Sequence, residues 1–495
     1  MDLNLITHWC PQPGRVVEWG VTATSAERAV SAPIDRDLPP TTMQDRHVRR
    51  ARAAAENGDP QSPWIGIAFD FEGNLDREAM TRSLAKYVRR HDTLHSWFSF
   101  DEATSDPTDV TFPVRRHVVP SESIDLTCRE GPELSDPEDV RALVAQRFAS
   151  ETSALAWPAF VFGAVEHAAT AGNAPSFTMF HAVDHAHTDL YSMVLMYSEL
   201  RALYAADVAG VDAALPPAGS YAEVGRREFA RASVLTMESP EVHQWLGYLM
   251  RSGGSFPGFA LPLGADDAPK PAIGSRFDLA DSAECEKFGE VCKANGSNFI
   301  GGIFTALAIT EFELAGRSNY IALSPVNTRT ENDESSQGWF INLIPVGIDI
   351  GEKRSFTALA ETGQQAYHQG KTLLDVSVQQ VIDVVLASMG DAGASSGLSK
   401  TLTPPPLVSY IDGRRTPDSD SYVATNATGI VGGKETQIAS VWINRVHEGA
   451  WMAISHPDTP TAHESVTRFA THLSGVIKAV ATQGDYSFSD TFGVV

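Results

Sequence analysis

Residues 181–189 read HAVDHAHTD, and the interpretation of the whole chain depends on this stretch. It places three histidines and two aspartates in nine positions, at the end of a predicted strand and just before a strongly patterned predicted helix over residues 188–207. Imidazole and carboxylate groups in this density serve as metal ligands or as acid–base groups. A third interpretation is purely structural, since a histidine at a strand end often only satisfies local hydrogen bonds. The three interpretations differ in the other residues that they require.

A metal site is the first interpretation. His185, His187 and Asp189 follow the H-x-H-x-D order with which the metal-binding run of metallo-β-lactamase-type hydrolases begins. Imidazole and carboxylate donors also suit zinc. However, Leu190 stands where that run has its next histidine, and His243 lies in a helix-like context instead of at a strand end. A metal-dependent hydrolase therefore stays open as an alternative.

Acid–base chemistry is the second interpretation. His185 and Asp189 are four residues apart at a strand-to-helix junction, a spacing at which two side chains can lie on one face. A carboxylate beside an imidazole either fixes its tautomer or braces the loop that carries it. A neutral imidazole can take a proton from a hydroxyl or an amine, and such help typically accelerates a reaction by about 10²- to 10⁴-fold. A single histidine is therefore sufficient if the site is a well-formed channel.

Other nucleophile and cofactor motifs are weak or missing. The sequence GASSG at 393–397 matches G-x-S-x-G, but it lies in a run of small residues without the strand and helix of a nucleophile elbow. No P-loop is present, and no G-x-G-x-x-G follows a predicted strand, so a nucleotide cofactor is not indicated. The cysteines are scattered and lack a C-x-x-C pair, which argues against a disulfide framework or structural zinc. They are Cys10, Cys128, Cys285 and Cys292.

Length and charge restrict the class of protein. A chain of 495 residues predicts two lobes of roughly 200–250 residues each. The net charge of −24 disfavours a nucleic-acid surface. We interpret the one dense basic run, RHVRRARA from Arg46, as the solvated face of an N-terminal helix, with a local anion contact as the alternative. The sequence lacks a signal peptide and a stretch of about 18 apolar residues, so we expect a cytoplasmic protein that can also contact the inner face of a membrane.

The predicted elements mix strands and helices in both halves without the βαβ rhythm of a doubly wound sheet. This mixture indicates an α+β fold. Residues 1–45 contain five prolines and are expected to be irregular. The proline- and glycine-rich stretch LPPAGSY at 215–221 marks the expected boundary between an N-terminal lobe, 1–220, and a C-terminal lobe, 221–495.

Beyond these patterns, the chain resembles a known family. Residues 184–189 are similar to the H-H-x-x-x-D-G signature of nonribosomal peptide condensation domains and related acyltransferases. His185, Asp189 and Tyr204 together resemble the polyketide-associated (Pap) acyltransferases of actinobacterial lipid assembly, above all those that acylate trehalose-based glycolipids. The segments RRHDTLHSWFSF, QGWFINLIPV, VSYIDG and VWINRV are similar to further segments of that family. The likeness covers almost the whole chain.

The resemblance implies two chloramphenicol-acetyltransferase-like lobes that form a V-shaped pseudo-dimer with a central channel. His185 would be the general base, and Asp189 would mainly hold the local structure. A backbone N–H, or a side chain such as that of Trp339 or Asn342, would meet the oxyanion. Weaker substrate-channel candidates are Tyr204, which would support the helix, Arg329, Trp339 and Asn342.

The resemblance also implies a reaction. An acyl chain would move from a thioester, either acyl-CoA or a carrier- or polyketide-synthase-bound chain, to a hydroxyl of a trehalose-type glycolipid, without a metal or a further cofactor. The enzyme would be a monomer, with a polyketide synthase or carrier protein as a partner. An amide-forming condensation domain stays open as an alternative, although carrier and adenylation domains usually accompany it.

This sequence departs from the signature at two positions. Asp184 stands where the signature has its first histidine, and Leu190 stands where it has glycine. His187 is expected on the face opposite His185, and His181 along the strand. These differences bear on substrate fit more than on the base itself.

Overall fold

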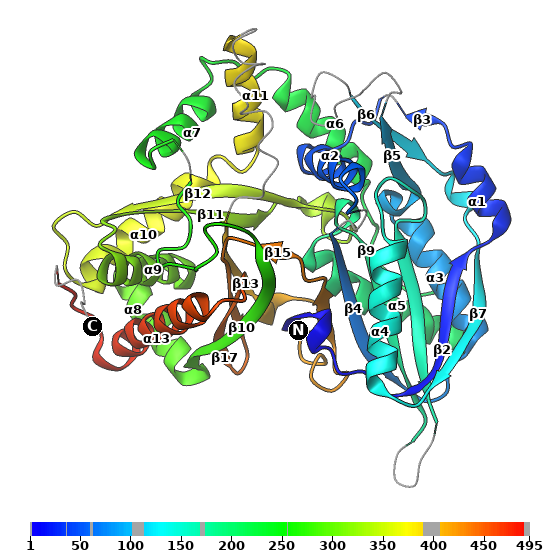
Figure 1. Cartoon of the computed structure of the whole chain (residues 1–495). Helices are drawn as coiled ribbons and strands as arrows, with labels where there is room; N and C mark the ends of the chain where they lie inside the picture. The colour runs from blue at the N-terminus through cyan, green and yellow to red at the C-terminus, as the bar shows by residue number, and fades with distance from the viewer. Residues whose placement is uncertain are drawn as a thin grey trace.

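The computed structural model describes residues 2–35, 37–59, 63–100, 113–168, 174–254, 256–389 and 406–489. The chain forms two halves that lie side by side, each built from a β-sheet with helices packed against it (Figure 1). Each half has its own hydrophobic core. The predicted α+β class is confirmed in this form.

The first half is built around a seven-stranded sheet in the order β1-β14-β4-β9-β8-β2-β7. All neighbours pair antiparallel except β1 and β14, which are parallel. The strands are β1 (Asp2–Leu5), β2 (Gly14–Val21), β4 (Trp64–Glu72), β7 (Leu126–Leu134), β8 (Phe160–His167), β9 (Ser176–Asp184) and β14 (Thr428–Val431). A small sheet of β3 (Ile34–Asp35), β6 (Val114–Val118) and β5 (Ser96–Phe100) lies beside it.

Helices cover both faces of this sheet, which explains why its central strands are apolar almost throughout. Along β9, Phe177, Met179 and Val183 join the core formed with α3 (Arg77–Arg90) and α5 (Leu190–Ala209). The intervening Phe180 and Ala182 join the core under α4 (Pro137–Glu151). The period of two therefore sends alternate residues to opposite helix layers, and β9 ends at the motif that contains His185.

The second half is built around a five-stranded sheet in the order β13-β16-β17-β10-β15, with helices α8, α9 and α13 packed against it. The strands are β10 (Lys270–Asp281), β13 (Val408–Asp412), β15 (Glu435–Thr436), β16 (Ser440–Val446) and β17 (Gly449–Pro457). The helices are α8 (Ser282–Ala294), α9 (Phe299–Ala315) and α13 (Pro460–Gln483). The hairpin β11 (Asn319–Asn327) and β12 (Ile341–Asp349) packs with α10 (Phe356–Lys371) beside this core.

Four helices lie along the upper part of the molecule (Figure 1). They are α2 (Thr42–Glu56), α6 (Tyr221–Ala232), α7 (Pro240–Arg251) and α11 (Val378–Met389). Among the described residues, no single helix is long and apolar enough to span a membrane, and α8 and α9 pass that test only as a pair that meets at 93°.

One strand from the second half of the sequence joins the sheet of the first half. Strand β14 follows β13 of the second half in sequence, yet it inserts between β1 and β4 of the first half's sheet. The expected boundary at residue 220 falls in the connection between α5 and α6 and stays a prediction. With any boundary in that connection, β14 belongs to the C-terminal part of the sequence but to the sheet of the first half.

The prediction that residues 1–45 are irregular is wrong. This region contains β1, β2, β3 and the helix α1 (Ala23–Val30), which Thr22 caps by accepting a hydrogen bond from the backbone N–H of Ser25. Within β2, the apolar residues Val16, Val17, Trp19 and Val21 are buried in the sheet. The prolines lie between these elements, so they mark the ends of elements instead of excluding structure.

The first part of the basic run on α2 is buried, which corrects its interpretation as a solvated face. Arg46, His47 and Arg49 are 8%, 2% and 2% exposed, because α2 lies between the two halves. Asp45 pairs with Arg49 at 2.7 Å, and Asp383 on α11 pairs with Arg46. Helix α2 thereby becomes part of the wall between the halves.

Candidate active site between the two halves

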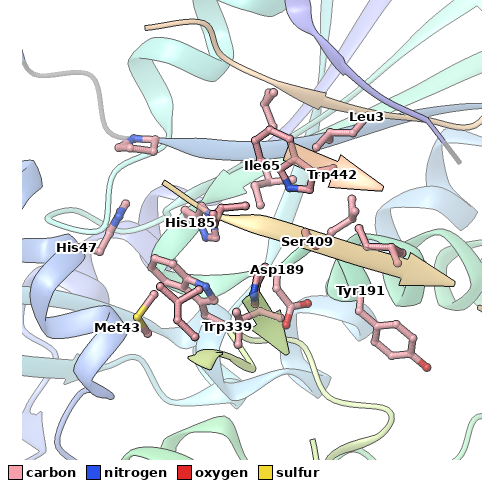
Figure 2. Close-up of a pocket in the computed structure, with 18 of the residues that line it drawn as sticks. Leu3, Met43, His47, Ile65, His185, Asp189, Tyr191, Trp339, Ser409 and Trp442 are labelled. Atoms are coloured by element: carbon pink, nitrogen blue, oxygen red, sulfur yellow. The ribbon is translucent and has the colours of Figure 1, made fainter. Parts of the chain in front are cut away.

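A cavity of about 1210 Å³ lies between the two halves. The first half contributes α2, β4 and the start of α5, and the second contributes β13, β16 and the β11–β12 hairpin with the segment leading into it. Its walls are mostly apolar, with a few polar side chains, as in pockets that bind small molecules. Figure 2 shows His185, Asp189 and Trp339 together within this cavity.

The local fold brings His185 to the cavity by ending the strand abruptly. Strand β9 stops at Asp184, and the single 3-10 turn η4 (His185–His187) leads into α5. Asp184 caps this turn by accepting a hydrogen bond from the backbone N–H of Ala186 at 2.8 Å. Asp189 caps α5 by accepting one from the N–H of Ser192 at 2.7 Å. The histidine therefore sits on a turn that a carboxylate cap fixes at each end.

The tautomer of His185 follows from one contact. Its Nδ1 lies 3.0 Å from the carbonyl oxygen of Thr188, which can only accept a hydrogen bond. Nδ1 therefore carries the proton in the neutral ring, and Nε2 is left with the lone pair. The ring lines the cavity, with its centroid 4.0 Å from that of Trp339. This is the arrangement that a general base requires.

The environment keeps His185 neutral. Burial lowers the pKa of His185 to about 4, and the neighbouring His47 also lowers it, whereas Asp184 and Asp189 act in the opposite direction. At neutral pH the ring is therefore uncharged and able to accept a proton. The two carboxylates favour the positive charge that the ring would acquire during proton transfer.

Asp189 serves the structure of the turn. Its carboxylate accepts hydrogen bonds from both terminal nitrogens of Arg329, at 2.8 and 3.1 Å, and from the backbone N–H of Phe340 at 2.9 Å. Both side chains of the ion pair are 2% exposed. Of the two roles that the spacing left open, the structure shows bracing of the loop, because the tautomer of His185 is set by Thr188 instead. Arg329 lies behind Asp189 and does not line the cavity.

A segment of the second half, residues 337–339, contacts this turn. The side-chain amide of Gln337 donates to Thr188 Oγ1 at 3.0 Å and accepts a hydrogen bond from the hydroxyl of Tyr87 at 2.9 Å. Gly338 leaves no room for a side chain, because an added Cβ would lie 2.3 Å from Tyr221 Cδ2. These contacts hold Trp339, the next residue, against the His185 ring.

Of the other residues predicted to line the channel, one lines the cavity and one does not. Asn342 lines the cavity, but its side-chain N–H donates to the carbonyl of Leu374 at 2.7 Å, so the amide is already engaged. Tyr204 does not line the cavity, which corrects its assignment to the channel. Its hydroxyl oxygen accepts the backbone N–H of Asp76 at 2.8 Å, and its ring packs on Phe177. Its expected role of supporting α5 agrees with these contacts.

The side chains of the metal interpretation do not converge. The His187 ring stacks on Phe98, its Nδ1 lies 3.1 Å from Thr93 Oγ1, and it does not line the cavity. The carboxylate of Asp189 is engaged by Arg329, and Nδ1 of His185 by Thr188. Within the described ranges, no group of three histidine, cysteine, aspartate or glutamate side chains could hold a metal ion.

His181 is buried in β9, where its Nδ1 lies 3.0 Å from the carbonyl oxygen of Val161. The G-x-S-x-G match at 393–397 lies outside the residues that the structure describes.

Comparison with known proteins agrees with this geometry. Residues 38–383 match the family described as the condensation domain. Over 98% of both chains, the sequence is 31% identical to acyltransferase PapA3 of Mycobacterium tuberculosis. The protein is a Pap acyltransferase of the condensation-domain family.

Further relatives of this acyltransferase carry more specific names. It is 28% identical to 2'-acyl-2-O-sulfo-trehalose (hydroxy)phthioceranyltransferase PapA1 of M. tuberculosis, over 98% of this chain and 89% of that one. A solved structure of PapA2 acyl transferase superposes with a TM-score of 0.84 at 26% identity, covering 97% of this chain and 100% of that chain. The first condensation domain of the calcium-dependent antibiotic synthetase superposes with a TM-score of 0.62 at 18% identity, covering 90% and 97%. The last likeness shows the fold alone.

Sequence reasoning missed three contributors to the site of the acyltransferase. Thr188 acts through its carbonyl, which no side-chain pattern reveals. Gln337 was part of a recognised segment but had no role assigned. His47 was hidden in the basic run, although Asp184 was a signal, since a carboxylate at a buried strand end needs a hydrogen-bonding partner.

Proposed function

We propose that this acyltransferase moves an acyl chain from a thioester to a hydroxyl of a trehalose-type glycolipid, with His185 as the general base. The observation that carries the proposal is the His185 imidazole on the cavity wall, with Nδ1 hydrogen-bonded to the carbonyl of Thr188 and Nε2 left as the acceptor. The acceptor class is supported by two relatives, whose names refer to 2-O-sulfo-trehalose and trehalose-2-sulfate. The donor is an acyl-CoA or a chain bound to a carrier protein or polyketide synthase.

In the proposed reaction, Nε2 of His185 removes the proton of the acceptor hydroxyl as its oxygen attacks the thioester carbonyl carbon. The carbonyl oxygen takes up the negative charge of the tetrahedral intermediate. When the intermediate collapses, the carbon–sulfur bond breaks and the sulfur takes the proton from the imidazolium. An ester and a free thiol result, and His185 is neutral again. Holding both substrates in line can contribute up to roughly 7–11 kcal/mol of the barrier reduction.

The indole N–H of Trp339 is the side chain that we propose for the oxyanion. It lines the cavity beside His185 and makes no hydrogen bond with the described residues. Asn342, the other sequence candidate, already donates to Leu374. A donor that is fixed in place before the reaction stabilises the developing charge without having to reorganise.

The acyl chain is proposed to lie along the apolar wall on one side of His185. Leu3, Ile65 and Trp442 lie together there (Figure 2), and they come from β1, β4 and β16. Polar groups lie elsewhere on the wall, including Tyr191 and Ser409, and these suit a sugar. Two substrates could thus approach the same imidazole from different sides.

Further parts of the proposal concern the whole molecule. The side-by-side halves are proposed to act as chloramphenicol-acetyltransferase-like lobes of a V, with the cavity as the channel between them. The enzyme is proposed to be a monomer. It is also proposed to be located in the cytoplasm and to contact the inner face of the membrane. Light scattering coupled to size exclusion and fractionation of cells test the last two points.

The decisive test replaces His185 by alanine and measures acyl transfer from palmitoyl-CoA to trehalose and to trehalose-2-sulfate. We expect turnover to fall by about 10²- to 10⁴-fold, the usual contribution of a general base. His243→Ala is the matched control, because His243 is exposed on α7 and does not line the cavity. Undiminished turnover in a folded His185→Ala protein, verified by circular dichroism, excludes His185 as the base.

A further inference from the structure

The residue before the proposed base has an unusual partner. Asp184 stands where the wider signature has a histidine, and a histidine from another element pairs with it. His47 on α2 places Nε2 2.8 Å from Asp184 Oδ1, and the two side chains are 2% and 0% exposed. The same carboxylate oxygen accepts the backbone N–H of Ala186 at 2.8 Å. One carboxylate therefore links the turn η4 to a histidine of α2.

His47 also belongs to the cavity wall. Its ring centroid lies 6.2 Å from that of His185, and it meets Trp339 edge-on at 5.6 Å. Figure 2 shows His47 on the same side of His185 as Met43, which lies one turn earlier on α2. The side-chain amide of Gln44 anchors the same helix by donating to the carbonyl of Ala186 at 2.8 Å. The ring is therefore held in place by contacts on both sides.

We propose that His47 and Asp184 act as one positioning pair, which fixes the turn η4, holds the His185 ring toward the cavity and shifts the pH range over which that ring accepts a proton. The proposal rests on the proposed role of His185 as general base. It assigns His47 no contact with the reacting atoms. Its effect is exerted through the charge on the pair and through the fixed geometry of η4.

His47 and Asp184 act on His185 through electrostatic interactions. After burial, His47 is the largest influence that lowers the pKa of His185, whereas a backbone hydrogen bond, then Asp184 and then Asp189 raise it. With the two ring centroids 6.2 Å apart, positive charge on both rings at once would be unfavourable. Removing His47 alone takes away the ring that lowers the pKa of His185 and leaves the carboxylate of Asp184, which raises it, in place, so a proton on His185 becomes more favourable. The other charged groups along the same cavity are Arg46, Arg50, Asp412, Arg415, Lys434 and Glu435.

The test measures the titration of His185 directly, by NMR of protein labelled with ¹³C at histidine Cε1. In His47→Gln, whose amide can still donate to Asp184, we expect the pKa of His185 to rise by on the order of one pH unit. In the double variant His47→Gln with Asp184→Asn, we expect the pKa of His185 to fall back, because the carboxylate that raises it is gone. A purely structural role would not produce this reversal. The acid limb of the kcat/KM profile should move in the same directions.

Two controls complete the experiment. His243→Gln removes an exposed histidine of α7 and should leave the His185 titration in place. His47→Asn serves as a second variant if His47→Gln does not fold. An unmoved His185 titration in a folded His47 variant, or a further rise in the double variant, overturns the proposal. The NMR titration requires no turnover, so the two proposals can fail separately. An unmoved titration contradicts the role of the pair, whereas undiminished turnover in His185→Ala contradicts the role of His185 as base.

Discussion

The two carboxylates on either side of His185 are held in contrasting ways. Asp184 and Asp189 are both buried, and each caps the element that follows it. Asp184 pairs with His47 of its own half, and a histidine is a partner without a permanent charge. Asp189 pairs with Arg329 of the other half, a partner that stays charged at every accessible pH.

This difference separates two tasks. A permanent ion pair that reaches across the halves suits mechanical bracing, because it does not change while the enzyme works. A histidine–carboxylate pair within one half suits the adjustment that we propose for the neighbouring His185. The turn that carries His185 is held on its C-terminal side by the second half and on its N-terminal side by α2.

Breaking the permanent pair should have the largest effect. Arg329→Ala leaves the carboxylate of Asp189 buried without its counter-charge, and we expect the free energy of unfolding to fall by about 3–5 kcal/mol. Urea unfolding followed by tryptophan fluorescence measures the loss. Arg231→Ala is the control, since Arg231 and its partner Asp375 are both exposed, and we expect a change of about 0–1 kcal/mol. Equal losses in the two variants would show that the permanent pair is no brace.

Much of this architecture could be predicted from the sequence. The mixture of predicted strands and helices in both halves indicated the α+β class. The strand ending in HAVD and the patterned helix that follows indicated the place of His185. Burial on both sheet faces explains why β4 and β9 were easy to recognise as strands. Strand β14 could not be anticipated, because its neighbours β1 and β4 lie hundreds of positions away in the sequence.

Side-chain roles were harder to predict than elements. Arginines usually face solvent, so RHVRRARA suggested an exposed face, and only the packing of α2 between the halves reverses that expectation. Tyr204 had the right spacing for a family motif, but the direction of its side chain depends on the rotation of α5. The partner of Asp189 lies 140 positions away, and spacing within the motif could not reveal it.

The neutral histidines near this turn predict a pH dependence of stability. Burial lowers the pKa of His181 to about 3 and the pKa of His187 to about 4, below the usual value of about 6.5 in unfolded chains. Between pH 6.5 and the lower values, the unfolded chain binds more protons than the folded one. The free energy of unfolding should therefore fall as the pH drops through that window, by about 1.4 kcal/mol per pH unit for each such histidine.

The measurement is the free energy of unfolding between pH 7 and 4.5, in the parent protein and in His181→Leu. Losing this buried histidine should make the decline shallower by up to about 1.4 kcal/mol per pH unit, whatever its effect at pH 7. His447→Leu, which changes an exposed residue after β16, is the control and should keep the parent slope. An unaltered slope in His181→Leu would mean that His181 is not held neutral in the folded protein.

The smallest expected effect lies further along the helix that Asp189 begins. Tyr204→Phe removes a hydroxyl that accepts the backbone N–H of Asp76 at the start of α3, so we expect a loss of about 1 kcal/mol in the free energy of unfolding. Turnover should stay unchanged, because Tyr204 lies outside the cavity. Thermal melts and the palmitoyl-CoA assay measure the two quantities on the same preparation. A fall in kcat without a fall in stability would contradict this expectation. It would mean that Tyr204 affects the reaction as well as the packing of α5 against α3.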